Sequence, residues 1–140
     1  MSKRVIIIFA AALVLVVVGF VVARPALKRA GESKECGNYM LAIGFAARLW
    51  GDNHDGHLPS DLLSMSNEVA TPKIFICPGD HSRHPAASWA AFTPSDSSYE
   101  VITPGLLVGD TKSVFLRCTL HGHLGYGDGT VFVNGRRHHK

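Results

Sequence analysis

The sequence predicts an α+β protein in which a long N-terminal transmembrane helix continues into an amphipathic helix packed on a small antiparallel β-sheet. Three observations lead to this class. Residues 5–23 are uniformly apolar, residues 32–50 repeat apolar side chains at steps of three and four, and the C-terminal half holds short alternating runs between turn residues. A helix that covers one face of an antiparallel sheet is a stable two-layer solution. We therefore divide the chain into a membrane anchor, residues 1–24, and a globular domain, residues 25–140.

The apolar N-terminal segment is long enough to cross a bilayer. Val5 to Ala23 comprises nineteen residues without a charged or strongly polar side chain. As a helix it would span about 28 Å, close to the hydrocarbon core of about 30 Å. A cleaved signal peptide is the main alternative, because basic residues precede the segment and Val21-Val22-Ala23 would serve as a cleavage site. The run is longer than a usual signal core, so we expect a retained single-pass anchor in the inner (cytoplasmic) membrane, with the lipid bilayer as its partner.

Charge restricts the partners of the chain. The formal net charge is +3, and much of the excess lies beside the anchor and in the tail, residues 136–140. This distribution suits anionic lipid headgroups, whereas nucleic acid is excluded because no basic stripe is interleaved with aromatic residues. We expect the tail, residues 136–140, to be a solvent-exposed chain end. The positive-inside rule alone would leave the bulk of the chain in the cytoplasm, but the cysteines and the resemblance described below favour the periplasm.

The helix over residues 32–50 is expected to bury one face. Gly51 is a natural stop, and Pro25 either kinks one continuous helix or separates two. The apolar stripe consists of Cys36, Tyr39, Met40, Ile43, Ala46, Ala47 and Trp50.

Shorter elements follow this helix. Residues 51–63 predict a turn-rich loop, residues 61–65 a short helix and residues 73–77 a buried strand, and a turn of helix is expected around Trp89. Residues 98–105 and 113–118 predict further strands. Residues 123–135 predict a β-hairpin with a two-residue turn at Asp128-Gly129. Its apolar residues at period two, expected to share one face of the sheet, are Leu124, Tyr126, Val131 and Val133.

The cysteines allow three interpretations. Cys77 and Cys118 each end a predicted strand, and a disulfide between them would close a loop of about forty residues, worth about 4 kcal/mol in an oxidising compartment. Alternatively, Cys77, His81, Cys118 and His121 have spacings of C-x3-H and C-x2-H that would suit a tetrahedral zinc site. The third interpretation is unpaired structural thiols. In each case Cys36 is left over as a small buried apolar residue.

No motif in the chain predicts an enzyme. Cys118 and His121 are close in sequence, but a catalytic pair also needs a third group that orients the base, and no oxyanion hole is marked. Nucleophile-elbow, zinc-protease, phosphate-loop and dinucleotide-binding patterns are absent from the sequence. We therefore predict no catalytic residue and no cofactor, and we expect His121 and His123 to be exposed residues at strand ends.

Several stretches together resemble a known family. The segments ECGNYMLAIGFAARLWGDNHDGHLP, TPKIFICPGD, ASWAAFTPSDSSYEV and RCTLHGHLGYGDGTV are similar to the pseudopilin-like proteins abundant in Verrucomicrobia and Planctomycetes. Each motif alone is weak, but the ordered set covers nearly the whole chain. The matching positions are Cys36, Asn38, Leu41 (shifted by one), Ile43, Ala46 or Ala47, Trp50, Asp52, Asn53, Gly56, Pro59, Cys77, Pro78, Asp80, His121, Gly122, Asp128, Gly129 and Val131.

The resemblance implies a pilin-like scaffold of a type II secretion or type IV pilus system. It implies a sheet domain facing the periplasm, assembly with other pilin-like subunits through the N-terminal helix, and no catalytic residues. One feature departs from the family: prepilins carry a Gly-Phe-Thr-Leu-x-Glu processing site, whereas here Lys3-Arg4 leads directly into Val5. The alternative function is a membrane-anchored zinc-binding module that uses the Cys/His cluster.

Overall fold

The computed structural model describes the backbone of residues 3–138 and the side chains of residues 7–138. The side chain of Val5 and the tail residues His139 and Lys140, which entered the predictions above, lie outside this description. The fold is α+β, as predicted, with one long N-terminal helix and a five-stranded antiparallel sheet.

Helix α1 runs from Lys3 to Asp52 and contains Pro25 in its interior. The chain therefore has no ordered non-helical linker between the apolar segment and the amphipathic one. Contacts divide the chain into two compact units, Met1–Gly31 and Glu32–Lys140. We describe each unit separately, the second as the globular unit.

In the first unit, the described side chains from Ile7 onward are exposed. Within the described residues, one helix is apolar and long enough to cross a membrane, with a mean hydropathy of 2.8 and none of its most apolar window buried. These properties would also fit an N-terminal signal sequence.

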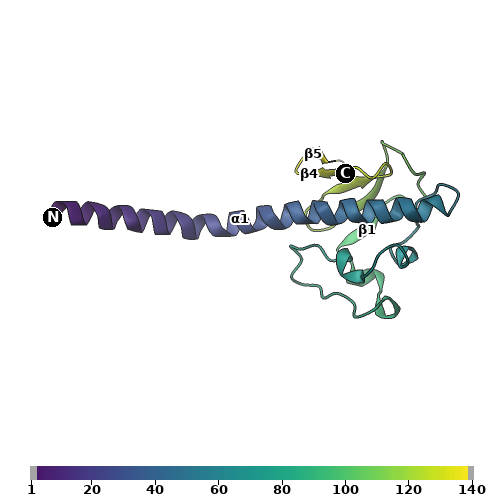
Figure 1. Cartoon of the computed structure of the whole chain (residues 1–140), viewed down its shortest axis with the longest axis horizontal. Helices are drawn as coiled ribbons and strands as arrows, with labels where there is room; N and C mark the ends of the chain where they lie inside the picture. Colours follow the sequence, from purple (N-terminus) through teal and green to yellow (C-terminus); the bar gives the residue numbers. More distant parts are fainter. Residues whose placement is uncertain (1–2, 139–140) are drawn as a thin grey trace. The chain divides into compact units, whose positions relative to one another are not determined.

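The globular unit contains the sheet, whose strands follow one another in space in their order along the chain, β1-β2-β3-β4-β5, with every neighbouring pair antiparallel (Figure 1). This is a meander, in which short connections suffice because consecutive strands are neighbours. The strands are β1 (Tyr99–Val101), β2 (Val114–Cys118), β3 (Leu124–Tyr126), β4 (Val131–Val133) and β5 (Arg136–His138). The predicted strands at 98–105 and 113–118 are confirmed as β1 and β2.

The 3-10 helices occupy the segment between α1 and β1. They are η1 (Leu63–Met65), η2 (Pro72–Phe75), η3 (Trp89–Ala91) and η4 (Pro94–Asp96). The short helix expected near 61–65 and the helical turn at Trp89 are confirmed, but the predicted strand at 73–77 is wrong because η2 occupies most of it. Thr71 caps η2 by accepting a hydrogen bond from the Lys73 N–H, and Pro72 supplies a helical φ at its start. These local signals for a helical turn outweigh the short apolar run at 73–77, which is compatible with a strand or with a helix.

The C-terminal tail also differs from its prediction. Residues 136–138 form β5, which pairs with β4 through Val131–His138, Phe132–Arg137 and Val133–Arg136. The side chains of β5 are exposed, as expected of a solvated end. Its backbone nevertheless pairs, because Asn134 and Gly135 adopt positive φ angles of 50° and 74° and form a tight turn after β4.

The β3–β4 hairpin is confirmed, but its predicted turn type and face are wrong. Gly129 has a positive φ of 83° whereas Asp128 does not, and the Tyr126 N–H donates to the carbonyl of Thr130. The loop therefore has three residues, with glycine in the left-handed position. The extra residue shifts the alternation by one, so Gly125 faces Val131 on the buried side while Leu124 faces Phe132 on the other.

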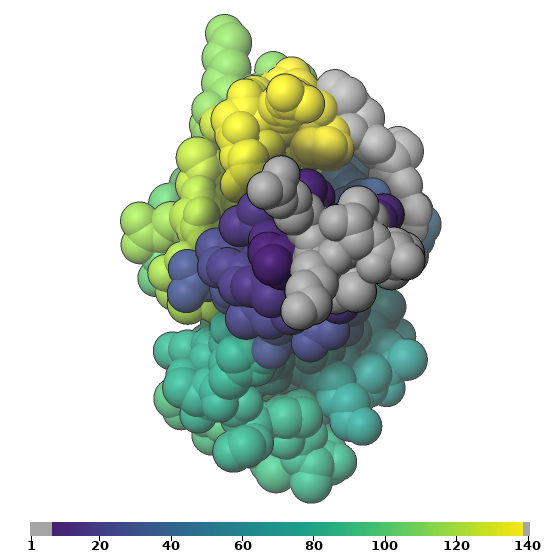
Figure 2. Space-filling view, turned by 90° about the vertical axis from the view of Figure 1, so that its left-hand side faces the viewer, coloured from purple at the N-terminus to yellow at the C-terminus, as the bar shows by residue number. Residues whose placement is uncertain are grey.

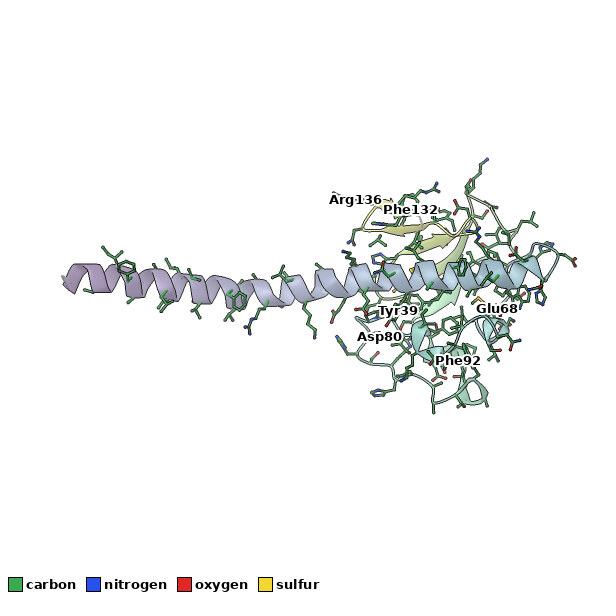
Figure 3. The ribbon with its side chains drawn as sticks, viewed as in Figure 1. Tyr39, Glu68, Asp80, Phe92, Phe132 and Arg136 are labelled. Carbon is green, nitrogen blue, oxygen red and sulfur yellow. The ribbon has the colours of Figure 1, made fainter. Side chains whose placement is uncertain are left out.

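The core of the globular unit lies between α1, the sheet and the 3-10 helices. The stripe predicted on α1 is buried at Cys36, Met40, Ile43, Ala46 and Ala47, while Tyr39 and Trp50 are partly buried against it. In Figure 2 the teal residues that follow α1 and the yellow C-terminal strands occupy opposite sides of the unit. Figure 3 shows the same division, with Phe132 and Arg136 on the strand side and Asp80 and Phe92 on the other.

Candidate functional site

Four chemically active side chains converge in the core. Cys36 Sγ, Cys77 Sγ, Cys118 Sγ and one ring nitrogen of His121 all lie within 4.8 Å of one another. The three cysteines are fully buried and His121 is half-buried. We refer to these four residues as the Cys3His cluster.

Helix α1 supplies Cys36, the first residue of its buried apolar stripe, one turn before Met40. The Tyr99 hydroxyl, on β1, donates a hydrogen bond to Cys36 Sγ at 3.5 Å. Burial raises the pKa of Tyr99, so the phenol keeps the proton that it donates.

Cys77 follows η2 and begins the sequence Cys-Pro-Gly-Asp. The chain turns sharply here, because the Asp80 N–H donates to the Cys77 carbonyl at 2.8 Å. Within this turn the backbone N–H of Gly79 acts to lower the pKa of Cys77, against the larger effect of Cys118, which raises it. Backbone donors of this kind stabilise a thiolate.

Cys118 is the last residue of β2, and the chain turns back immediately after it. The Gly122 N–H donates to the Cys118 carbonyl at 2.9 Å, and the Cys118 N–H donates to the His123 carbonyl at 2.9 Å. The turn brings the His121 N–H to 3.4 Å from Cys118 Sγ and its Nδ1 to 4.0 Å from the same sulfur. His121 Nδ1 also lies 3.2 Å from Cys77 Sγ.

The three thiols share their protons unequally. Hydrogen bonds from the Cys36 and Cys77 thiols, with the backbone N–H groups of His121 and Leu120, lower the pKa of Cys118 to about 2. Donating to Cys118 raises the pKa of Cys77 to about 11 and raises that of Cys36 as well. Within the cluster, these contacts favour the thiolate form at Cys118 over Cys36 and Cys77.

The structure assembles three of the four residues that the sequence proposed as zinc ligands. Cys77, Cys118 and His121 meet, whereas His81 is exposed and its Nε2 lies 3.2 Å from Glu32 Oε1. The turn at Pro78–Asp80 directs the chain away from the cluster before His81. Cys36 lies in its place, and sequence reasoning missed it because it is far from the other ligands along the chain.

The candidate disulfide partners are also adjacent. Cys77 and Cys118 belong to the cluster, and all three cysteines are free thiols in the structure. The Cys77–Cys118 disulfide stays a prediction, with Cys36 as an additional neighbour that the sequence did not indicate.

His123 differs from its prediction, because it is buried and not exposed. Its Nε2 lies 3.0 Å from Ser33 Oγ and 3.2 Å from the Ser33 carbonyl oxygen. A carbonyl only accepts, so the second contact requires the proton on Nε2. The imidazole stacks on His121, with ring centroids 5.2 Å apart, and burial lowers its pKa. His123 therefore ties the sheet to α1 as a neutral side chain.

Asp80 holds the Cys77 turn in place. Its buried carboxylate accepts hydrogen bonds from Ser82 Oγ at 2.6 Å, from Ser98 Oγ at 2.7 Å and from the Arg83 guanidinium. Burial alone would raise the pKa of Asp80, but the hydrogen bonds from Ser82, Ser98 and Arg83 hold it well below its usual value. The contact with Ser98 fixes the Cys77 turn against the segment that leads into β1, the strand paired with Cys118.

Comparisons of this chain with protein-family models, with curated proteins and with solved structures find no match.

Proposed function

We propose that this chain is a single-pass, membrane-anchored structural protein of the cell envelope, related to pseudopilins and acting in a type II secretion or pilus-like assembly. The observation that carries the proposal is α1, a 50-residue helix with an exposed apolar segment, whose later residues form the core with an antiparallel sheet. This is the arrangement expected of a pilin-like subunit. The proposal gives the chain a structural role and no catalytic activity.

The exposed side chains of α1 support the anchor. Leu13, Leu15 and Phe20 are 65%, 72% and 56% exposed. Covering one Leu or Phe side chain contributes about 1.5–3 kcal/mol, so a continuous run of them strongly favours a lipid environment.

Membrane fractionation of cells that express the full chain tests the anchor. The protein is expected to stay in the membrane pellet after an alkaline carbonate wash, and its intact mass should include residues 5–23. A soluble product whose mass corresponds to cleavage after Ala23 would contradict the proposal, because residues 5–23 would then be a signal peptide.

We infer that the globular unit faces the periplasm. The resemblance to pseudopilins supports this side; the cysteines, which are free in the structure, do not add to it. Fusions at Lys140 test the inference: alkaline phosphatase should be active and green fluorescent protein dark. The opposite pair of results would place the unit in the cytoplasm, as the positive-inside rule alone suggests.

A second copy of the chain is the proposed partner of α1. Phe45 and Leu49 are 54% and 40% exposed and lie four residues apart, so they share one face of the helix. A photo-crosslinking residue at Phe45 in the full chain should yield a membrane-bound dimer, whereas the same probe at exposed Lys112 should not. Equal yields at the two positions, or no dimer from Phe45, would refute this contact.

A further inference from the structure

We propose that Cys36, Cys77, Cys118 and His121 bind one Zn²⁺ ion in a closed, four-coordinate structural site. The proposal rests on the convergence of four soft ligand atoms within 4.8 Å of one another. They come from α1, from the turn after η2 and from the end of β2, so nothing local in the sequence forces them together.

The spacing of the ligand atoms fits a tetrahedral ion. Zn–S bonds of about 2.3 Å and Zn–N bonds of about 2.0–2.1 Å place ligand atoms about 3.6–3.8 Å apart at the corners of a tetrahedron. His121 Nδ1 lies 3.2 Å from Cys77 Sγ and 4.0 Å from Cys118 Sγ, on either side of that value. Shifts of a few tenths of an ångström would therefore complete the site, with Nδ1 as the ligand atom of His121.

A disulfide accounts for this arrangement less well than a metal. A disulfide joins two sulfurs, and the cluster contains three, together with an imidazole nitrogen aimed at two of them. Buried polar groups are normally satisfied by partners of matching number and geometry. One Zn²⁺ ion satisfies all four ligand atoms at once.

The surroundings of the cluster support negatively charged sulfur. The His121 N–H lies 3.4 Å from Cys118 Sγ, and the Tyr99 hydroxyl lies 3.5 Å from Cys36 Sγ. Once bound, three thiolates, one neutral imidazole and Zn²⁺ carry a net charge of −1. Donors aimed at the sulfurs offset this buried charge, as outer-shell groups do in other metal sites.

Gly79 leaves room for the imidazole. A Cβ atom at this position would lie 3.0 Å from His121 Cε1 and 3.2 Å from His121 Nε2. Glycine therefore lets the Cys77 turn approach the ring edge while Nδ1 faces the sulfurs. The four ligands fill the coordination sphere, so no position remains for water or substrate, which makes the site structural and not catalytic.

Metal analysis of the full chain, purified in detergent under reducing conditions with Zn²⁺ present, tests the proposal. We expect about one zinc ion per chain in the wild type and in His81→Gln, and little zinc in Cys36→Ser. His81→Gln is the matched control because His81 follows Cys77 closely but lies outside the cluster. Zinc retained by Cys36→Ser and lost from His81→Gln would overturn the ligand assignment.

Two measurements on the wild type do not depend on how a variant folds. Replacing zinc with Co²⁺ should produce the absorption bands of a tetrahedral cobalt–thiolate centre, and alkylation after denaturation in the presence of a chelator should modify all three cysteines. A folded wild-type chain that binds neither metal would refute the site. Two results together would assign the cluster to a disulfide instead. Protein prepared without reductant would show only one alkylated cysteine, and the same protein would bind no zinc after reduction.

Discussion

Substituting Gly37 tests how closely α1 approaches the sheet. A Cβ atom at Gly37 would lie 2.5 Å from Cγ2 of Val133 on β4, and Val133 is only 7% exposed. Both the helix backbone and a β-branched side chain are fixed at this contact, so neither can yield cheaply. Overpacking of this kind costs about 1–3 kcal/mol, against which alanine gains up to about 1 kcal/mol of helix propensity.

Gly44 provides the matched control for Gly37→Ala. It is a buried glycine of the same helix, but a Cβ there would meet its nearest neighbour, the Gly129 Cα, at an ordinary 3.6 Å. Gly44→Ala therefore gains helix propensity without a clash. We expect Gly37→Ala to be less stable than Gly44→Ala by about 1–3 kcal/mol, which is the steric cost alone.

Urea unfolding of the full chain in detergent measures this difference. The two tryptophans of the chain, Trp50 and Trp89, both belong to the globular unit, so their fluorescence reports its unfolding. Val133→Ala should cost less stability in the Gly37→Ala background than in the wild type, because it removes the clashing methyl groups. Equal stability of Gly37→Ala and Gly44→Ala, with no coupling to Val133, would refute this packing of α1 on β4.

The same unfolding assay checks three further predictions. Asp80→Asn should destabilise the globular unit by about 1.5–3 kcal/mol near neutral pH. Because the folded pKa of Asp80 lies below its usual value of about 3.9, this difference should be fully present above about pH 4–5 and shrink as the pH falls through the folded pKa; a pH-independent difference would contradict it. Gly129→Val should cost about 1–3 kcal/mol because valine is strained at a φ of 83°, and a neutral result would mean that the turn adopts another conformation. His123→Ala should lower the free energy of unfolding by about 1–3 kcal/mol, because it removes the hydrogen-bond partner of Ser33. A change within about 0.5 kcal/mol would indicate that His123 is exposed, as the sequence predicted.

Elements with strong local signals were predictable from the sequence. Apolar periodicity on α1, alternation in β1, the short apolar run of β2 and the glycine of the β3–β4 turn each act over a few residues. The strand expected at 73–77 failed because Thr71 and Pro72 start a 3-10 helix there. β5 was not anticipated because its exposed polar side chains carry no burial pattern, and only its backbone pairing defines it.

The candidate site was only partly predictable. Cys77, Cys118 and His121 could be named from their spacing, since each lies at or beside a sharp turn. Cys36 lies on the buried apolar stripe of α1, so the sequence indicated only an ordinary core residue. The same position on the helix places its sulfur beside the other ligands. His81 has a plausible ligand spacing, but the turn after Cys77 leaves it exposed beside Glu32.

By itself, the sequence determined what local interactions control: an apolar segment of membrane-spanning length, one buried helix face and the positions of the turns. The tertiary structure decided which sulfurs meet, which face of β3 is buried and that His123 lies against Ser33. These outcomes depend on how α1 docks on the sheet and on a hairpin register set by one extra loop residue. Contacts between residues 33 and 123, or between 36 and 118, leave no periodic trace in the sequence, because only packing of the whole core brings them together.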